Sequence, residues 1–275
     1  GSNSDRYYYT LPSYSYSTIF NIENLNGTFD FSSSGSNSLS ETNVTATSIN
    51  NSLRFAKYDS FTLNGIKTNY EIFFRNTNSV GKNSEKFKNS PQSELTSDYR
   101  YNVSLPLFKN TKKFNNRLIP KLSLRVSPHD MKDNSEEKRK INVKNLFYGN
   151  RLGLGNSFES GESLTLGVDF IKEKVNTIIS EGKELTEIVN YFDFKLGTVL
   201  RLSEQKFIPL NSTLNKKKSN IFGHAQFNPN ANTSINYDFS LTERLDRFES
   251  NSLGIALEFE NFSTSFNYLE ESGVL

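Results

Sequence analysis

The sequence has no cysteine among its 275 residues. This absence excludes a disulfide framework and a cysteine-ligated zinc site, and it leaves the redox compartment undetermined. Long apolar runs are also missing, since none approaches the roughly 20 residues of a membrane-spanning helix. The first residues show no basic start followed by an apolar core, so no signal peptide is predicted. We expect a chain that is either not exported or a mature or excised fragment.

The sequence has no large excess of either charge, and it contains few apolar residues. The formal net charge is only +2, and the basic residues are scattered at turns, which argues against nucleic-acid binding. Hydrophobic residues make up 35% of the chain and the mean hydropathy is -0.59, which is low for a soluble globule of this length. The 23 phenylalanines and 13 tyrosines nevertheless exceed what a disordered chain contains. The sequence therefore predicts an ordered protein with little apolar material to bury.

What the sequence has instead is a repeated alternation of apolar with small or polar residues. In SLTLGVDF (163–170), the leucines, the valine and the phenylalanine fall on one side of an extended chain, and the other residues fall on the opposite side. Similar runs lie at 99–105, 121–126, 190–203, 234–241, 253–260 and 262–268, with weaker ones near 14–20, 27–33, 42–47, 52–58, 68–75 and 219–227. About a dozen strands in an antiparallel meander, and no helix, are predicted.

The connectors between these runs differ in length. Long polar stretches lie at 76–94, 127–145 and 203–219 with a moderate one at 242–250, and short ones lie at 228–233 and 260–262. Bacterial outer-membrane barrels likewise have short turns on one side and long loops on the other. Segment 171–187 departs from this scheme, because it falls where a short turn is expected.

Three classes of β-structure are compared with this pattern: a soluble sandwich, a solenoid and a membrane barrel. A soluble β-sandwich also alternates, but its strands are usually shorter and its core fuller. A solenoid would show a short fixed period, and none is found. In a membrane barrel lipid covers the apolar face and water fills the lumen, so half of each strand can be polar. We therefore predict an all-β fold, an antiparallel up-and-down transmembrane β-barrel, present over residues 1–275 as a partial, open wall.

The alternation divides the wall residues into two sets. The set predicted to face lipid contains Leu164, Leu166, Val168, Phe192, Phe194, Leu196, Tyr237, Phe239, Leu257 and Phe259. The set predicted to face the lumen contains Asp169, Asp193, Lys195, Arg201, Asp238 and Glu258. In a sandwich, by contrast, the first set would pack together in a closed interior.

The sequence gives little indication of a catalytic site. Without cysteine, nucleophilic chemistry needs a serine with a histidine base, and the two histidines are interpreted as a solvated loop residue, His129, and a wall residue, His224. The charge runs 109–113, 136–140 and 215–219 are interpreted as solvated loop charges, with contact to anionic lipid head groups as the alternative. No enzyme activity, cofactor or metal site is predicted.

One stretch carries a motif beyond the alternation. Residues 145–168, NLFYGNRLGLGNSFESGESLTLGV, resemble part of the C-terminal barrel region of the lipopolysaccharide-assembly outer-membrane protein family (LptD, also called Imp or OstA). That family often shows N-L-F-x-x-N-R-F, a Gly-Leu-Asp-Arg turn, E-x-G and a strand with a late glycine. The matching residues are Asn145, Leu146, Phe147, Asn150, Arg151, Glu159, Gly161 and Gly167. The resemblance runs over about 95–270.

The resemblance implies a very large barrel in the outer membrane of a Gram-negative bacterium, with a separate periplasmic jelly-roll and a lateral seam for lipopolysaccharide. It implies as partners lipopolysaccharide, outer-membrane lipid, an LptE-like plug lipoprotein and a periplasmic LptA-like bridge, and it implies non-enzymatic insertion of lipopolysaccharide into the outer leaflet. The chain is expected to be an internal barrel fragment without the jelly-roll. A nutrient-uptake barrel, either a porin or a plugged transporter, is the alternative, because it shares every periodicity argument.

Overall fold

The alternating runs of the sequence form strands. The computed structural model describes residues 8–40, 43–155, 157–180 and 183–272. The strands are β1 (Tyr8–Ile22), β2 (Gly27–Ser40), β3 (Val44–Lys57), β4 (Ser60–Phe61), β5 (Lys67–Lys82), β6 (Gln92–Ser104), β7 (Leu107–Asn110), β8 (Phe114–Ser127), β9 (Gly161–Ser180), β10 (Lys183–Arg201), β11 (Ile221–Asn230), β12 (Thr233–Leu241), β13 (Phe248–Glu258) and β14 (Ser263–Glu271). The short 3-10 helices are η2 (Glu23–Leu25) and η3 (Leu210–Ser212). Within the described ranges, no helix has the length and apolarity needed to cross a membrane.

The strands pair in chain order, as expected for a meander. The hydrogen-bonded order is β1-β2-β3-β5-β6-β8-β9-β10-β11-β12-β13-β14, while β4 pairs with β5 and β7 pairs with β8. β1 and β14 stand at the two ends of this order, so the fourteen strands of the described residues form an open antiparallel sheet. The predicted fold class, an all-β antiparallel wall that is not closed, is confirmed.

The contacts divide the chain into two compact units. The first contains Gly1–Asp59, Asn69–Tyr101 and Val126–Asp130, and the second contains Ser60–Thr68, Asn102–Arg125 and Met131–Leu275.

In the first unit, the pairing of β2, β3 and β5 separates apolar from charged side chains. Phe31 is paired with Leu53, and Leu53 with Phe74, so these three side chains form one cross-strand row. On the other face, Asp30 is paired with Arg54, and the Arg54 Nη1 lies 2.8 Å from the Asp30 Oδ2. Each strand of this group therefore contributes to one apolar and one polar face.

The second unit shows the same separation on β9 to β14. Leu196 of β10 is paired with Val168 of β9 and with Gly223 of β11, and Gly223 is paired with Phe239 of β12. None of the ten residues predicted to face lipid is buried, and Phe259 among them directly follows the end of β13. These side chains therefore share one face of the sheet and do not form the closed interior of a sandwich.

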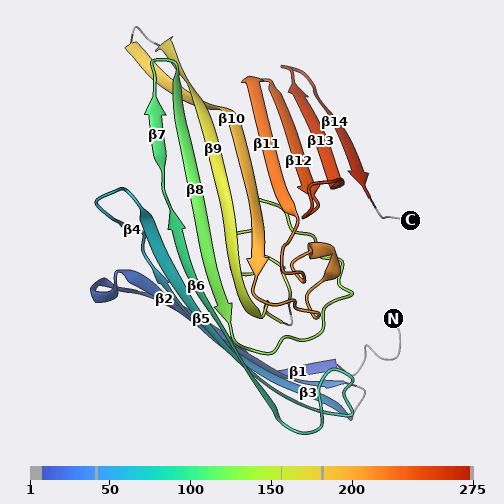
Figure 1. Ribbon diagram of the computed structural model, residues 1–275. Coiled ribbons are helices and arrows are strands. Elements are labelled where there is room, and N and C mark those ends of the chain that lie inside the picture. The colour runs from blue at the N-terminus through green and yellow to red at the C-terminus, as the bar shows by residue number, and fades with distance from the viewer. Residues whose placement is uncertain (1–7, 41–42, 156, 181–182, 273–275) are drawn as a thin grey trace. The chain divides into compact units, whose positions relative to one another are not determined.

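Several strands are longer than the sequence predicted. Segment 171–187 falls where a short turn would be expected, and its described residues instead extend β9 and β10, whose strands reach past β11 to β14 (Figure 1). The runs 42–47 and 52–58 were expected to be separate, but their described residues from Val44 to Lys57 belong to one strand, β3. Much of 76–94 belongs to β5 and β6. Backbone pairing continues in all three places through polar residues that give no alternating signal.

The assignment of faces predicts unequal effects of a buried charge. Leu196→Arg, near the middle of the apolar face, should lower the free energy of unfolding of the complete barrel by about 2–4 kcal/mol, because its guanidinium would enter hydrocarbon without a partner. Asn236→Arg on the polar face of β12 is the control and should change it by less than about 1 kcal/mol. Equilibrium unfolding in lipid vesicles measures both, and equal losses would contradict the assignment.

Candidate functional site

Two long loops of the second unit lie against its sheet. Residues 131–160 precede β9 and residues 202–220 connect β10 to β11. Figure 1 shows both loops beside the same ends of β9, β10 and β11. The short turns of this unit, between β7 and β8, between β11 and β12 and between β13 and β14, lie at the opposite ends of the strands. The long connectors predicted near 127–145 and 203–219 thus gather on one side of this unit.

An apolar cluster joins the two loops to the sheet. Its buried members are Met131, Ile141, Val143, Leu146, Leu152, Leu154, Val199, Ile208, Leu214 and Phe222. Val199 and Phe222 belong to β10 and β11, where they alternate with the residues of the apolar face. The loops therefore pack on the polar face, and the buried core of this unit lies between loops and sheet.

Two glycines allow the first loop to approach the strands. Gly167 of β9 is paired with Gly197 of β10. A Cβ at Gly197 would lie 2.7 Å from Leu146 Cδ2, and a Cβ at Gly167 would lie 2.8 Å from the Phe147 ring. Real Cβ atoms do not come so close to neighbours, so a larger residue at either position would force the side chain of Leu146 or Phe147 to shift.

Three arginines converge on the carboxylate of Glu159 where the first loop meets the sheet. The Arg151 Nε donates to Glu159 Oε2 at 2.7 Å and its Nη2 to Oε1 at 2.5 Å. Arg125 Nη1 donates to Oε2 at 2.9 Å, and Arg201 Nη1 donates to Oε1 at 2.5 Å. No side chain of the four is more than 6% exposed. Since Arg125 belongs to β8 and Arg201 to β10, one carboxylate ties the loop to two strands.

Further donors of Arg125 and Arg151 bind the loop backbone and strand hydroxyls. The Arg125 Nη2 donates to the carbonyl of Gly149 at 2.5 Å. The Arg151 Nη1 donates to Thr165 Oγ1 at 2.9 Å, and its Nη2 donates to Ser163 Oγ at 3.1 Å. Planar guanidinium groups suit this role because each presents five donors in a fixed geometry.

The charges of the cluster control the ionisation of Glu159. Burial by itself raises the pKa of this carboxyl group, but the neighbouring charges of Arg151 and Arg125 outweigh burial and hold the pKa well below its usual range. Arg201 acts in the same direction. The carboxylate is therefore ionised at every physiological pH, and removing it would leave buried arginines without their anion.

The other residues of the sequence motif shape the loop itself. The Asn145 Oδ1 accepts from the N–H of Asn142 at 3.1 Å, and the carbonyl of Asn150 accepts from the N–H of Gly153 at 3.1 Å. Gly161 opens β9 with a φ of 86°, a left-handed conformation that favours glycine. Together with the glycine contacts and the arginine cluster, these residues show that the motif encodes a loop folded onto the strands.

The six charged residues predicted to face the lumen share the polar face, and most of them are paired. Ion pairs join Asp169 to Lys121 at 2.8 Å, Asp193 to Lys195 at 3.3 Å and Asp238 to Lys144 at 4.0 Å, and Asp238 is also hydrogen-bonded to His224 at 2.9 Å. Arg201 lies beneath the first loop in the arginine cluster, and Glu258 at the end of β13 is exposed. That this face lines a lumen stays a prediction.

The two histidines differ in their surroundings. His224 is 2% exposed, and its Nδ1 lies 2.9 Å from Asp238 Oδ1 on the neighbouring strand, as suits a wall residue. His129 is only partly exposed, and its Nδ1 lies 3.1 Å from the carbonyl oxygen of Ser97, so it is less solvated than the sequence suggested. Within the described ranges, no group of three or more His, Cys, Asp or Glu side chains could hold a metal ion.

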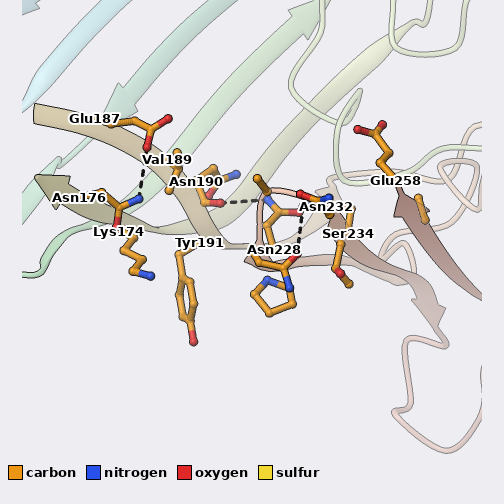
Figure 2. Close-up of a pocket in the computed structure, with 15 residues that line it drawn as sticks. Lys174, Asn176, Glu187, Val189, Asn190, Tyr191, Asn228, Asn232, Ser234 and Glu258 are labelled. Carbon is orange, nitrogen blue, oxygen red and sulfur yellow. Dashed lines mark hydrogen bonds between the residues drawn. The ribbon is translucent and has the colours of Figure 1, made fainter. Parts of the chain in front are cut away.

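A polar hollow of about 520 Å³ lies beside the β11–β12 turn (Figure 2). The Asn228 Nδ2 donates to the carbonyl of Asn190 at 3.0 Å, and the Asn176 Nδ2 donates to Glu187 Oε2 at 3.4 Å. The described residues that line it include no histidine, so no serine–histidine pair is built there. The arrangement offers amide, carbonyl, carboxylate and ammonium groups for hydrogen bonding.

Loss of the Glu159 charge should destabilise the whole unit. Glu159→Gln should lower the free energy of unfolding of the complete barrel by about 3–5 kcal/mol, because it leaves buried guanidinium groups uncompensated. Glu136→Gln, at an exposed position of the same loop, is the control and should change it by no more than about 0.5 kcal/mol. Denaturant unfolding in lipid compares the two, and similar stabilities would show that the cluster does not hold the loop.

The lowered pKa of Glu159 predicts resistance of the loop to acid. The carboxylate contributes its full stabilisation above the unfolded-state pKa near 4.5, and the contribution is lost progressively as the pH falls from there to the lower folded-state value. At pH 3 residues 131–160 should therefore resist pepsin in the unmodified protein and be cleaved in Glu159→Gln. Equal cleavage of the two proteins, followed by mass spectrometry of the fragments, would contradict this expectation.

The sequence model of one protein family matches almost the entire chain. The family is described as LptD: LPS transport system D, and the match covers residues 4–274. No curated protein matches the chain. The matched span includes both units, the arginine cluster and the motif at 145–168 that resembled this family. Members of this family act in lipopolysaccharide transport and assembly at the outer membrane of Gram-negative bacteria. This chain belongs to the LptD family.

Proposed function

We propose that this chain forms part of the wall of an outer-membrane translocon that inserts lipopolysaccharide into the outer leaflet. In this proposal, residues 1–275 form one wall segment of a larger barrel. Family membership supplies the general role in lipopolysaccharide transport. The two faces of the sheet support the finer role, since one face is apolar enough to meet hydrocarbon and the other is polar.

The observation that carries the proposal is the folded loop on the polar face. Residues 131–160 are fixed there by the buried apolar cluster and by the carboxylate of Glu159. In a barrel built from this wall, such a loop occupies part of the lumen and narrows the aqueous path. A translocon that must pass a large amphipathic lipid without leaking solutes needs this closure. The apolar face remains free to contact lipid.

The partners follow from the same arrangement. We propose that the complete protein binds lipopolysaccharide, outer-membrane lipid, an LptE-like plug lipoprotein and a periplasmic LptA-like bridge. The pair Asp169–Lys121 and the side chain of Asp238 lie on the polar face, where a plug lipoprotein inside the barrel would contact the wall. The proposed transport requires no enzyme activity, because it moves an intact lipid and forms or breaks no covalent bond.

Variants of the loop and of the histidines separate transport from catalysis. In a host that depends on the full-length protein, Leu146→Asp should reduce lipopolysaccharide at the cell surface and admit large antibiotics, because it places a charge where Leu146 is 1% exposed. Tyr148→Asp, two residues away and 64% exposed, should remain near normal. The combined variant His129→Ala, His224→Gln should also retain export.

Antibody labelling of surface lipopolysaccharide and antibiotic sensitivity measure the outcome, with barrel abundance determined in the same cells. Loss of export in the histidine variant at normal barrel abundance, together with normal export in Leu146→Asp, would favour an enzyme instead. Normal export in every variant would remove the proposed role of the loop.

A further inference from the structure

A groove of about 520 Å³ lies on the second unit where β7, β8 and β9 run side by side (Figure 1). Its lining is mainly apolar but contains two lysines. Its lining residues include Leu107, Lys109, Phe114, Leu118, Phe170 and Lys172. Leu107 is paired with Leu118, and Phe170 belongs to the apolar face of β9, so the groove opens on the face that meets hydrocarbon.

Aromatic rings mark one end of this groove. The Phe114 ring lies 5.4 Å from the Tyr191 ring, which lies 5.2 Å from the Phe227 ring. The Lys172 Nζ lies 4.2 Å from the centre of the Phe114 ring and 5.5 Å from that of Tyr191. In membrane barrels such aromatic groups, with lysines that extend toward water, lie at the boundary between hydrocarbon and head groups.

The length of the apolar face agrees with this boundary. Between Leu202 and Phe192 the face spans about 25 Å of bilayer, for a rise of about 3.3 Å per residue and a strand tilt of about 40°. The Tyr191 ring comes directly after Phe192, and beyond it the hairpin of β9 and β10 carries Lys174 and Glu187. The groove therefore lies where acyl chains end and head groups begin.

The charge at this end suits an anion. Lys109, Lys112, Lys113, Lys172 and Lys174 gather around the β7–β8 turn, since the N–H of Val175 donates to the carbonyl of Lys113 at 2.9 Å. In the part of the chain that the structure describes, neither Lys109 nor Lys172 forms an ion pair with a carboxylate. An apolar groove with two such ammonium groups complements a phosphate joined to acyl chains.

We propose that this groove binds one anionic phospholipid of the surrounding bilayer. An acyl chain lies along Leu107, Leu118 and Phe170, and the phosphate lies between Lys109 and Lys172. Short turns of outer-membrane barrels face the periplasm, so the lipid belongs to the inner leaflet. The inference requires only that the sheet is a membrane wall, and it is independent of the proposed insertion of lipopolysaccharide. It also gives the lysine-rich run 109–113 a ligand.

Native mass spectrometry of the purified full-length protein in mild detergent tests the site. Short-chain phosphatidylglycerol is titrated against phosphatidylcholine of the same chain length, which has no net charge. Lys109→Gln with Lys172→Gln should weaken phosphatidylglycerol binding about tenfold. Lys138→Gln with Lys216→Gln, in the loops at the other end of the strands, should leave it unchanged. Lys109→Arg with Lys172→Arg keeps both charges and should bind as the unmodified protein does.

Three results would overturn the site. The first is equal phosphatidylglycerol affinity in the glutamine variant and the unmodified protein. The second is equal affinity for phosphatidylcholine. The third is displacement of phosphatidylglycerol by a lipid A bisphosphate in the unmodified protein but not in the glutamine variant, which would place an outer-leaflet lipid in the groove. Because binding is measured on purified protein, failure of lipopolysaccharide export in cells does not affect this test.

Discussion

The carboxylate of Glu159 is the contact on which the loop arrangement of the second unit depends. The arginines at 125, 151 and 201 all pair with this one carboxylate, and they come from β8, the loop and β10. Burying one negative among three positive charges is favourable only where further acceptors bind the guanidinium groups, and here loop carbonyls and strand hydroxyls accept from Arg125 and Arg151. The glycine contacts and the apolar cluster assemble around this point.

The sheet has one apolar and one polar face because successive side chains of a strand point to opposite faces. On one face Leu196, Phe239 and their neighbours form cross-strand rows, and in the described part of the chain these two side chains are not buried. On the other face, glycines stand where the loop comes closest, and charged pairs such as Asp169–Lys121 stand farther along the same strands. A low fraction of apolar residues is sufficient for such a protein, since lipid replaces half of the core.

The sequence predicted the strands well wherever their two faces meet different surroundings, as in 163–170 and 234–241. It failed at 171–187, where β9 and β10 continue past the aromatic rings and both faces can meet water, so no alternation is selected. The motif identified Arg151 and Glu159 as significant but not their partner Arg201, because a contact between residues 42 positions apart leaves no local pattern. The sequence also could not predict that Gly197 makes room for Leu146, because a glycine occurs within a strand for several different reasons.

The position of the apolar cluster also sets the order in which the strands and the first loop can fold. Residues 131–154 are synthesised before β9, yet their buried partners include Val199 of β10 and Phe222 of β11. The loop can therefore complete its core only after three later strands lie beside one another, and closing so long a chain segment costs entropy until they do. Folding of the loop thus reports that this part of the wall has the correct strand order, and a mispaired wall leaves Leu146, Leu152 and Leu154 exposed to quality control.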